Sequence, residues 1–388
     1  MRIAQMLDTL AWGGAQKMQM FLVDSLQPLG IDITVISLTE SSNSPLELKL
    51  QEAGVRVVFC PFPKLFSPGS FSDVVSLLKK EKFDLLHAYL TYSNIVGSLA
   101  GVLTGTPTIA SLRSADFEGR NYTPQRAFLE NFSLRFLATR VMANGLAVAK
   151  YASHRVKNSR SVDIIPNAVN FVHSIPAVER EKLRQELTGD ATRPLILTVG
   201  RLTEAKGFPD LIQAFAEVHV QYPSAILVVA GGGSLSDSLD EQIKKLGLQE
   251  QVILLGSRTD VPRLLAAADI YINSSHWEGT PVSVLEAMSA GLPIIATRVG
   301  ENPYLLEPDA GVLVHPHQPH ELAAALVYLL SSEDRCHKLG AAALERVRNY
   351  YTPEIWRYNL LKLYSELTPN AVPYLESFSN KPFQVGEV

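Results

Sequence analysis

Glu278-Gly-Thr-Pro-Val-Ser-Val-Leu-Glu286, which runs on as Ala287-Met-Ser-Ala-Gly-Leu-Pro-Ile-Ile-Ala-Thr297, predicts a loop, an amphipathic helix and a buried strand in succession. Pro281 suits the first helical position, where a missing N–H costs nothing. An apolar stripe then follows at helical spacing, formed by Val284, Leu285 and Met288. This helix-to-strand succession is the unit that alternating α/β folds repeat.

Two carboxylates, those of Glu278 and Glu286, stand on either side of the start of this helix. We expect Glu278 in the loop and Glu286 about a turn and a half further on. Free backbone N–H groups and the positive end of the helix dipole lie between them and favour a phosphate. One glutamate could hold a sugar and the other a ribose, which indicates a site for an activated sugar. The alternative is a pair of solvated glutamates without function.

A second motif, Leu195-Ile-Leu-Thr-Val-Gly200-Arg201-Leu202-Thr-Glu-Ala-Lys206-Gly207-Phe208, predicts a buried strand that ends at Gly200 and Arg201 before a helix. In open parallel sheets, ligands bind beyond the carboxyl ends of the strands. Arg201 and Lys206 at such an end are suited to neutralising a diphosphate without a metal. Each cation alone is more often a plain surface residue, but the combination with Gly200 and Gly207 favours the diphosphate.

Together these motifs resemble family 4 of the retaining GT-B glycosyltransferases. The resemblance extends over about residues 1–367 and is strongest over 195–315. It rests on Gly200-Arg-Leu, Lys206-Gly207, the Glu278-x7-Glu286 pair and the Gly291-Leu-Pro run. The family implies an α/β fold of two doubly wound, Rossmann-like parallel-sheet domains facing a cleft, with a C-terminal helix that crosses back to the first domain. It also implies sugar transfer with retention from a nucleotide-diphospho-sugar.

The chemistry of the motifs and the resemblance assign three groups of site residues. The catalytic candidates are Arg201, Lys206 and Glu278. The donor-binding candidates are Gly14, Gly200, Arg258, Gly279, Thr280, Pro281, Leu285, Glu286 and Gly300. The candidates on the acceptor or sugar side are Gly13, His87 and Arg113. For His87, burial as an ordinary core histidine is an equal alternative, and Arg258 is as well suited to capping the next helix as to stacking on the base.

Apolar runs and amphipathic stretches alternate along the chain. Strands are expected at residues 3–7, 33–38, 55–60, 84–87, 108–112, 140–143 and 162–165, and then at 195–199, 225–230, 252–255, 270–273, 293–296 and 311–314. This alternation favours two doubly wound parallel-sheet domains. We expect an N-terminal acceptor-side domain over 1–172, a nucleotide-sugar-binding domain over 190–350, a crossover helix over 351–370 and a loosely ordered tail over 371–388.

Two positions depart from the family pattern. Arg113 follows the strand at 108–112, where many relatives carry a His that contacts the donor sugar. An Arg could neutralise phosphate or bind an acidic acceptor, but it cannot act as a general base. In Val299-Gly300-Glu301-Asn302-Pro303-Tyr304, a single glycine is kept and Tyr304 replaces a family Glu. Both changes put the identity of the donor in doubt more than the transfer reaction.

Two further patterns carry less. The glycines in Ala230-Gly231-Gly232-Gly233 follow a strand, but Ser236 occupies the third glycine position of a dinucleotide-binding loop. The run His315-Pro-His317-Gln-Pro-His320 resembles a metal site by count only, because prolines interrupt it. We therefore expect no metal and no cofactor.

Composition agrees with a large globular enzyme. Its 388 residues allow two to three domains, and an apolar content of 46% is ample for full cores. No apolar run reaches 18 residues, and Met1-Arg-Ile-Ala-Gln-Met-Leu-Asp8 is predicted as a strand and not as a signal peptide. The two cysteines, Cys60 and Cys336, imply no disulfide framework. A reducing cytoplasm fits, and the net charge of −4 gives no reason to expect a nucleic-acid partner.

A membrane contact is a separate hypothesis. The stretch 124–138 carries Phe128, Phe132 and Phe136 together with Arg126 and Arg135. Such a segment could contact lipid headgroups at the inner face of the cell membrane. Burial of the aromatic residues in the core is the favoured alternative.

The function predicted from the sequence is transfer of a sugar from a nucleotide-diphospho-sugar, first of all a UDP-sugar, to a hydroxyl acceptor. The acceptor would be a polysaccharide, a lipid-linked precursor or another glycan. The rivals are a sugar-nucleotide epimerase, a phosphorylase and a non-catalytic nucleotide-sugar-binding protein. An NAD-dependent dehydrogenase is disfavoured by the missing third glycine.

Overall fold

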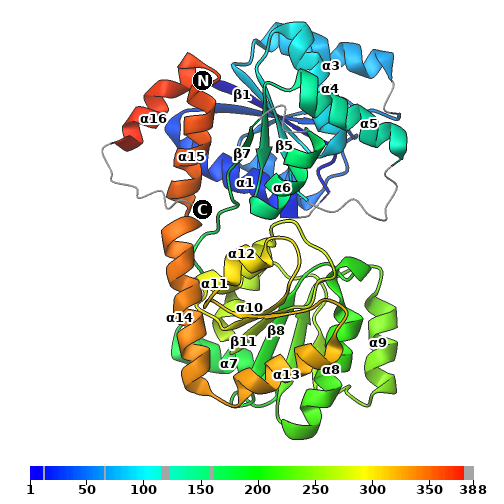
Figure 1. Cartoon of the computed structure of the whole chain (residues 1–388), viewed down its shortest axis with the longest axis vertical. Coiled ribbons are helices and arrows are strands. Elements are labelled where there is room, and N and C mark those ends of the chain that lie inside the picture. Colours follow the sequence, from blue (N-terminus) through cyan, green and yellow to red (C-terminus); the bar gives the residue numbers. More distant parts are fainter. Residues whose placement is uncertain (12–13, 65–66, 115–122, 157–160, 380–388) are drawn as a thin grey trace. The chain divides into compact units, whose positions relative to one another are not determined.

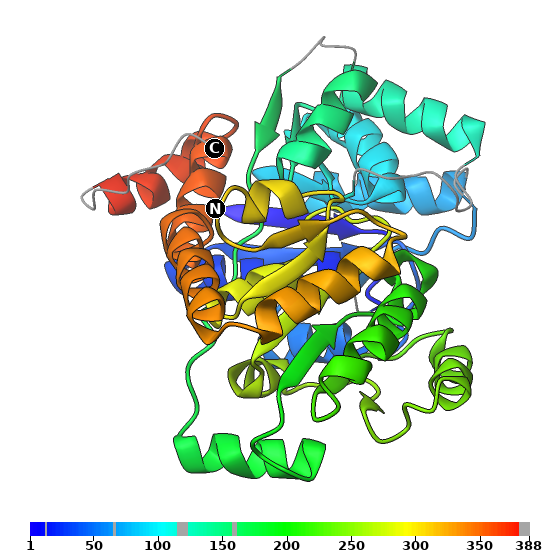
Figure 2. The same ribbon diagram turned by 60° about the horizontal axis from the view of Figure 1, so that its bottom comes forward.

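The computed structural model describes residues 1–11, 14–64, 67–114, 123–156 and 161–379. The chain divides into two compact units. The first comprises Met1–Asn167 and the described part of Pro353–Val385, and the second comprises Ala168–Thr352. Each unit is a parallel sheet covered by helices on both faces (Figures 1 and 2).

In the first unit, the described strands form one seven-stranded parallel sheet in the order β3-β2-β1-β4-β5-β6-β7. The strands are β1 (Arg2–Leu7), β2 (Asp32–Ser37), β3 (Arg56–Phe59), β4 (Leu85–Tyr89), β5 (Thr108–Leu112), β6 (Arg140–Ala143) and β7 (Val162–Ile164). The helices are α1 (Gly14–Leu26), η1 (Gln27–Leu29), α2 (Pro45–Glu52), α3 (Pro68–Glu81), α4 (Thr91–Thr104), α5 (Pro124–Phe132), the π-helical η2 (Ser133–Leu137) and α6 (Leu146–Arg155). The strand order reverses between β1 and β4, so ligands are expected beyond their carboxyl ends.

In the second unit, the described strands form a six-stranded parallel sheet in the order β10-β9-β8-β11-β12-β13. The strands are β8 (Leu195–Val199), β9 (Ile226–Ala230), β10 (Val252–Leu254), β11 (Ile270–Asn273), β12 (Ile294–Thr297) and β13 (Val312–Val314). The helices are α7 (Ala177–Thr188), η3 (Glu204–Lys206), α8 (Phe208–Gln221), α9 (Ser236–Lys245), α10 (Val261–Ala267), α11 (Val282–Ser289), α12 (Asn302–Leu306), α13 (Pro319–Leu330) and α14 (Glu333–Tyr350). Here the order reverses between β8 and β11.

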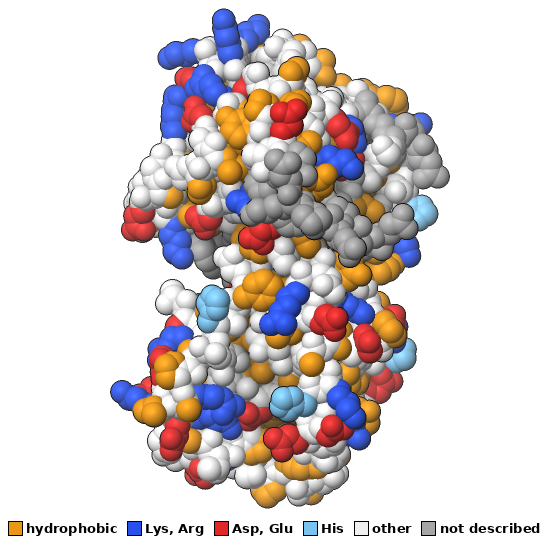
Figure 3. Space-filling view, turned by 90° about the vertical axis from the view of Figure 1, so that its left-hand side faces the viewer, with side chains coloured by type: hydrophobic (Ala, Val, Ile, Leu, Met, Phe, Trp, Pro, Cys, Tyr) orange, Lys and Arg blue, Asp and Glu red, His pale blue; other side chains and the backbone are white. Residues whose placement is uncertain are grey.

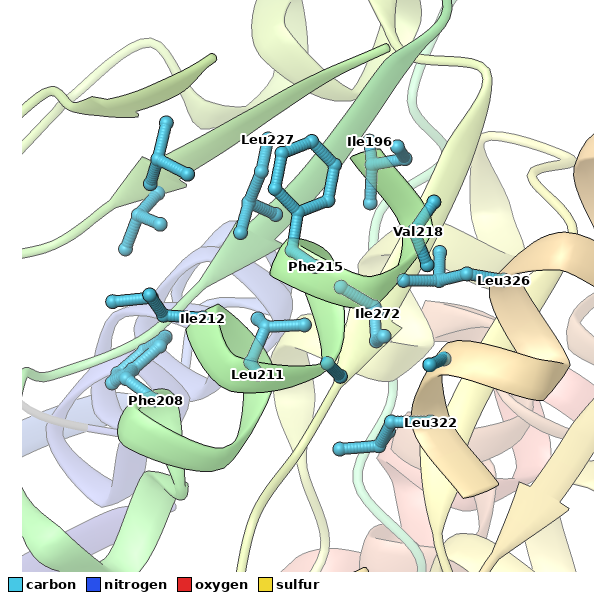
Figure 4. Packing of buried hydrophobic residues seen from close by; sticks show 14 of the residues in the cluster. Ile196, Phe208, Leu211, Ile212, Phe215, Val218, Leu227, Ile272, Leu322 and Leu326 are labelled. Carbon is cyan, nitrogen blue, oxygen red and sulfur yellow. The ribbon is translucent and has the colours of Figure 1, made fainter. Parts of the chain in front are cut away.

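The strands of the second sheet are mostly apolar because both faces are covered; the exceptions, Thr198, Asn273 and Thr297, lie at or next to the carboxyl ends of their strands. Neighbouring residues of a strand point to opposite faces. Ile196 therefore packs into one core with α8, α9 and α13, whereas Leu197 packs into the other core with α10, α11 and α14. In Figure 4, Phe208, Leu211, Ile212 and Phe215 of α8 lie among strand residues and the α13 residues Leu322 and Leu326. Full burial of each such side chain stabilises the fold by about 1.5–3 kcal/mol.

The end of the chain returns to the first unit. Helix α14 belongs to the second unit, whereas α15 (Pro353–Ser365) belongs to the first. Trp356 of α15 packs edge-on against Phe21 of α1, with ring centroids 5.2 Å apart. The predicted fold class, with two doubly wound parallel sheets and a C-terminal helix that crosses back, is confirmed.

The segment after α15 differs from the prediction. A loosely ordered tail was expected from residue 371, but η4 (Pro369–Ala371) leads into the helix α16 (Val372–Ser379). The Tyr374 hydroxyl of α16 accepts a hydrogen bond of 3.2 Å from the nitrogen of Met1. This contact spans nearly the whole sequence, so no local pattern could reveal it.

The aromatic residues of the stretch 124–138 are not in the core. Phe128, Phe132 and Phe136 are 68%, 44% and 56% exposed. The favoured expectation of core burial is therefore wrong for these three residues, because the buried face of this segment is formed by others, namely Glu130, Ser133, Leu134 and Ala138. None of the described helices is long and apolar enough to cross a membrane.

On the face drawn in Figure 3, positive and negative side chains are interspersed over the second unit.

Candidate functional site

Two loops meet at the carboxyl ends of the neighbouring strands β8 and β11. The Ser274 hydroxyl donates to the Lys206 carbonyl over 2.9 Å, and the His276 N–H donates to the Ala205 carbonyl over 2.8 Å. Gly207, with a φ of +60°, is where the loops come closest, since a Cβ there would lie 2.1 Å from the Ser274 carbonyl oxygen. The glycine of the Lys206-Gly207 pair is thus required for the two loops to touch.

The cation and the carboxylate predicted on these two loops form an ion pair. The Lys206 ammonium bonds to Glu278 Oε1. The same oxygen accepts hydrogen bonds from the Ser275 hydroxyl at 2.7 Å and from the Asn273 amide at 3.3 Å. The side chains of Lys206 and Glu278 are only 21% and 9% exposed. The pair is therefore largely shielded from water, which strengthens it and fixes both groups.

Arg201 lies on the surface and follows Gly200, at which a Cβ would lie 3.7 Å from the Lys206 side chain. Its side chain is exposed, and within the described residues its guanidinium forms no ion pair. The glycine-rich turn after β9 packs closely against Gly200 and Leu202, the residues on either side of Arg201. A Cβ at Gly231 would lie 1.8 Å from the Gly200 carbonyl oxygen, and a Cβ at Gly233 would lie 2.4 Å from the Leu202 carbonyl oxygen. The Gly231-Gly232-Gly233 run thus has a packing role, and Arg201 is a cation open to an anion from solvent.

The start of α11 lies one residue later than predicted, at Val282, and Pro281 is its N-cap residue. Gly279 is half-buried, whereas Thr280 and Pro281 are buried. The first N–H groups of a helix have no partner within it, so this end of α11 offers donors to an anion. Its dipole adds a favourable positive potential.

A third loop, after β12, closes on this segment. The Glu301 N–H donates to the Gly279 carbonyl over 2.9 Å. Gly300 has a φ of +52°, and a Cβ there would lie 2.5 Å from the Glu278 carbonyl oxygen. The single glycine that this chain keeps is therefore the one at the point of closest approach. Glu301 is buried and Tyr304 is half-buried.

The second glutamate of the pair is buried. Glu286 of α11 is 8% exposed. Burial raises the pKa of the Tyr271 phenol, and the negative charges of Glu286 and Glu278 raise it further. One phenol thus lies within electrostatic reach of both glutamates, in agreement with a shared site. The Leu285 side chain, predicted to bind the donor, is fully buried in the core.

Arg258 is held by its neighbour. Its guanidinium bonds in bidentate fashion to the Asp260 carboxylate, at 2.8 and 2.7 Å, and it remains exposed. Asp260 is the N-cap residue of α10. This pair lowers the pKa of Asp260. The Asp260 side chain forms no capping hydrogen bond with α10, so the structure shows Arg258 in a local ion pair and in neither of its two predicted roles.

In the first unit, His87 and Arg113 lie close to two tyrosines. His87 lies in the middle of β4 and is fully buried. Its Nδ1 is 2.9 Å from the Tyr364 hydroxyl and 3.1 Å from the Tyr89 hydroxyl. The Arg113 guanidinium lies 5.2 Å from the centre of the Tyr89 ring. Burial, together with the Arg113 charge, lowers the pKa of His87. His87 is therefore a buried histidine in an environment that favours its neutral form.

The glycine loop after β1 lies mostly outside the described residues. Gly13 is among the residues that the structure does not describe, and Gly14 is the first residue of α1. At the same edge, Asp8 caps α4: its carboxylate accepts hydrogen bonds from the N–H and the hydroxyl of Ser93, both 2.7 Å, and from the N–H of Tyr92 at 3.1 Å.

Several polar residues of the site were missed from the sequence. Asn273 is the last residue of β11, Ser275 lies two residues further on, and Asp8 directly follows β1. Their position at the end of a buried strand could have identified them, because polar residues at the carboxyl end of a strand in a parallel sheet lie at the ligand-binding edge.

Two family models match the chain. The model described as "Glycosyl transferases group 1" matches residues 179–346, and the one described as "Glycosyl transferase 4-like domain" matches residues 13–168. The first therefore covers the β8–β11 edge and the second covers most of the first unit.

The chain is also similar to individual glycosyltransferases. It is 27% identical over 247 residues to the Escherichia coli UDP-Gal:alpha-D-GlcNAc-diphosphoundecaprenol alpha-1,3-galactosyltransferase, over 61% of this chain and 64% of the relative, which is less than two thirds of its length. It is 26% identical over 298 residues to the D-inositol 3-phosphate glycosyltransferase of Corynebacterium glutamicum, over 71% of each. The structure of Anabaena HepE in complex with UDP matches with a TM-score of 0.84 and 21% identity, over 94% of this chain and all of HepE. At that identity the match shows the fold.

Proposed function

The chain consists of a glycosyl transferase 4-like domain over 13–168 and a glycosyl transferases group 1 domain over 179–346, and from this premise we propose that it is a retaining glycosyltransferase that uses a UDP-sugar. The sugar would pass to a hydroxyl of a glycan or lipid-linked precursor. The observation that carries the proposal is the cluster at the carboxyl ends of β8 and β11: an exposed Arg201 beside the shielded Lys206–Glu278 pair, next to the start of α11. It combines cations for a diphosphate with a carboxylate for sugar hydroxyls.

The choice of UDP draws on the similar proteins. The E. coli relative is named for a UDP-galactose donor, and HepE was crystallised with UDP. In this chain Glu286 would hold the ribose hydroxyls from α11. Arg201, Lys206 and the start of α11 would hold the diphosphate, and Glu278 would orient the sugar.

The Lys206–Glu278 pair sets how the donor would enter. Within the pair, each charge neutralises the other. An incoming diphosphate first meets Arg201, which is exposed, and then shares Lys206 with Glu278. Glu278 then loses part of its interaction with Lys206, and hydrogen bonds from the sugar hydroxyls would replace that part. Binding energy is thereby directed to the reacting end of the donor.

The reaction breaks the bond between the anomeric carbon and the β-phosphate oxygen, and the bonding electrons remain on that oxygen. The negative charge that develops there is what Arg201 and Lys206 would stabilise. The acceptor oxygen forms the new bond to the anomeric carbon on the face that the diphosphate leaves. Its proton passes to a leaving phosphate oxygen, so retention requires no protein base.

Arg113 would face the acceptor. A guanidinium cannot take a proton, but it binds carboxylate or phosphate in bidentate fashion. The Arg113 guanidinium lies 5.2 Å from the centre of the Tyr89 ring, and Tyr89 is held through His87 to Tyr364, so these residues would position it. An anionic acceptor is therefore the class we propose.

Contact with a membrane surface completes the proposal. The exposed Phe128, Phe132 and Phe136, here called the aromatic stripe, lie on α5 and η2 beside α4, which exposes Leu99, Val102 and Leu103 (Figure 1). Arg135 lies 5.1 Å from the Phe136 ring and adds a positive charge at the edge. Apolar side chains flanked by Arg favour the headgroup region of anionic lipid.

Liposome co-sedimentation tests this contact. We expect the protein to pellet with anionic vesicles and a Phe128→Ser/Phe136→Ser variant to stay in the supernatant. Val178→Ser/Val220→Ser, which changes two exposed valines of the second unit, is the matched control and should pellet like the parent protein. A parent protein that remains in the supernatant would exclude the stripe as a lipid-binding surface.

The activity itself is tested with a panel of UDP-, GDP- and ADP-sugars, with and without lipid and glycan acceptors. Acceptor-dependent release of UDP, with the anomeric configuration kept in the product, is the expected result. Interconversion of the sugar nucleotide without an acceptor would indicate an epimerase. Tight binding of the donor without turnover under any condition would indicate the non-catalytic alternative.

A further inference from the structure

A cluster of two histidines and one carboxylate lies on the second unit, next to but separate from the residues proposed to bind the donor. Asp210 is in the first turn of α8, His276 follows β11, and His317 lies in the turn before α13. From this geometry we propose that Asp210, His276 and His317 bind one divalent transition-metal ion of the zinc class.

The three side chains converge from segments that are far apart in sequence. His276 Nε2 lies 2.8 Å from Asp210 Oδ2, and His317 Nδ1 lies 3.9 Å from the same oxygen. One ligand atom from each residue lies within 4.8 Å of the other two. Metal–ligand bonds of about 2.0–2.2 Å in a tetrahedral zinc site place ligand atoms about 3.3 Å apart. Small side-chain rotations therefore bring all three onto one ion.

The backbone around the cluster is fixed. The His276 N–H is bonded to the Ala205 carbonyl over 2.8 Å, and Phe208, Leu211 and Ile212 anchor the start of α8 in the core (Figure 4). His317 adopts a left-handed backbone conformation with a φ of +58°, which residues other than glycine seldom adopt. This conformation brings its ring to 3.7 Å from the His276 ring, centre to centre.

The donor set selects the type of ion. Imidazole nitrogens suit zinc, copper and nickel, whereas magnesium and calcium prefer oxygen ligands alone. Three protein ligands leave a coordination position for water. The His317 side chain is 64% exposed, so an ion can enter from solvent.

The ion would have a structural role. His276 is two residues before Glu278 on the same loop, and Asp210 is four residues after Lys206. An ion bound between them would fasten the β11–α11 loop to α8 and to the turn before α13. The competing explanation is that the Asp210–His276 hydrogen bond fastens the loop without any ion. In that case His317 would be dispensable.

The test is a titration of the purified full chain, freed of metal by a chelator, with Zn²⁺ alone. We expect one Zn²⁺ per chain and a rise in Tm. His317→Gly removes a ligand while its backbone conformation suits glycine, so the variant should fold. We expect its affinity for Zn²⁺ to fall by at least about 100-fold, since even partners behind the ligands are worth about 10–100-fold. His276→Ala should behave in the same way.

The matched control is His315→Ala/His320→Ala, which removes the two neighbouring histidines that pair with Glu321 and Glu217. It should bind Zn²⁺ like the parent chain. The proposal is overturned if the parent chain binds no Zn²⁺, if His317→Gly binds as well as the parent, or if the control loses as much affinity as His317→Gly. Because the readout is metal binding, these results do not depend on the proposed sugar transfer.

Discussion

Alanine at Arg201 and alanine at Lys206 should have different effects on stability and the same effect on turnover. Both cations are proposed to hold the diphosphate. Only Lys206 is part of a shielded ion pair, with Glu278. Arg201 is exposed and makes no ion pair within the described residues. Comparing the two variants therefore separates the structural contribution of a cation from its contribution to catalysis.

The magnitudes follow from the surroundings of each cation. Removing one partner of a fully buried ion pair costs about 3–5 kcal/mol. After Lys206→Ala, Glu278 keeps the Ser275 and Asn273 donors, and the pair was partly exposed, so we expect the free energy of unfolding to fall by about 1–3 kcal/mol. Arg201→Ala should change it by less than about 0.5 kcal/mol. Each variant should lower kcat by about 10²-fold or more, the usual effect of losing one charge-stabilising contact.

Urea denaturation measures the stabilities, and UDP release at saturating donor measures turnover. Lys244→Ala is the matched control, because Lys244 forms an exposed pair with Asp240 on α9, and it should leave both quantities unchanged. Wild-type turnover in Arg201→Ala would remove Arg201 from the diphosphate site. An Lys206→Ala protein as stable as the parent would refute the inference that the shielded pair holds the two loops.

Three further predictions concern single residues. Glu278→Gln should impair transfer while sparing UDP binding measured by calorimetry, and equal loss of both would give Glu278 a structural role. Gly231→Ala should lower both stability and turnover, because its Cβ would lie 1.8 Å from the Gly200 oxygen, whereas Gly69→Ala, with no atom within 4 Å, should do neither. Burial holds the pKa of His87 well below its usual value of about 6.5, so below that pH the unfolded chain binds a proton that the native state does not. Stability should therefore fall with decreasing pH by up to about 1.4 kcal/mol per unit, and His87→Asn should lack this part of the slope in urea denaturation at several pH values.

The fold could be predicted because the strands of both sheets are buried on two faces. A run such as Leu195–Val199 is then apolar except for Thr198 and ends sharply at glycine. The helix α11 was placed to within one residue for a similar reason, since its apolar stripe begins just after a proline. The aromatic stripe misled because an apolar residue indicates a helix face without saying whether protein, lipid or solvent covers that face.

The site could be predicted in part. Arg201, Lys206 and Glu278 were found because each follows a strand or precedes a helix at the ligand-binding edge. The ion pair itself joins residues 72 positions apart, and the carboxylate oxygen that bonds to Lys206 also binds Ser275 and Asn273. No spacing within either motif encodes that contact, because it depends on the register between β8 and β11.

Arg113, where the resemblance led us to expect a histidine, has a physical counterpart elsewhere in the chain. Burial lowers the pKa of His87, and the positive charge of Arg113 lowers it further. A neutral His87 leaves its Nδ1 to interact with two tyrosine hydroxyls, one of which, Tyr364, is supplied by the returning helix α15. Helix α15 therefore contributes a residue directly to the cluster of His87, Tyr89 and Arg113. A change of residue type at position 113 alters the charge next to His87, Tyr89 and Tyr364. Under the proposed function, the identity of the acceptor is therefore better sought in this cluster than in the motifs at the β8–β11 edge.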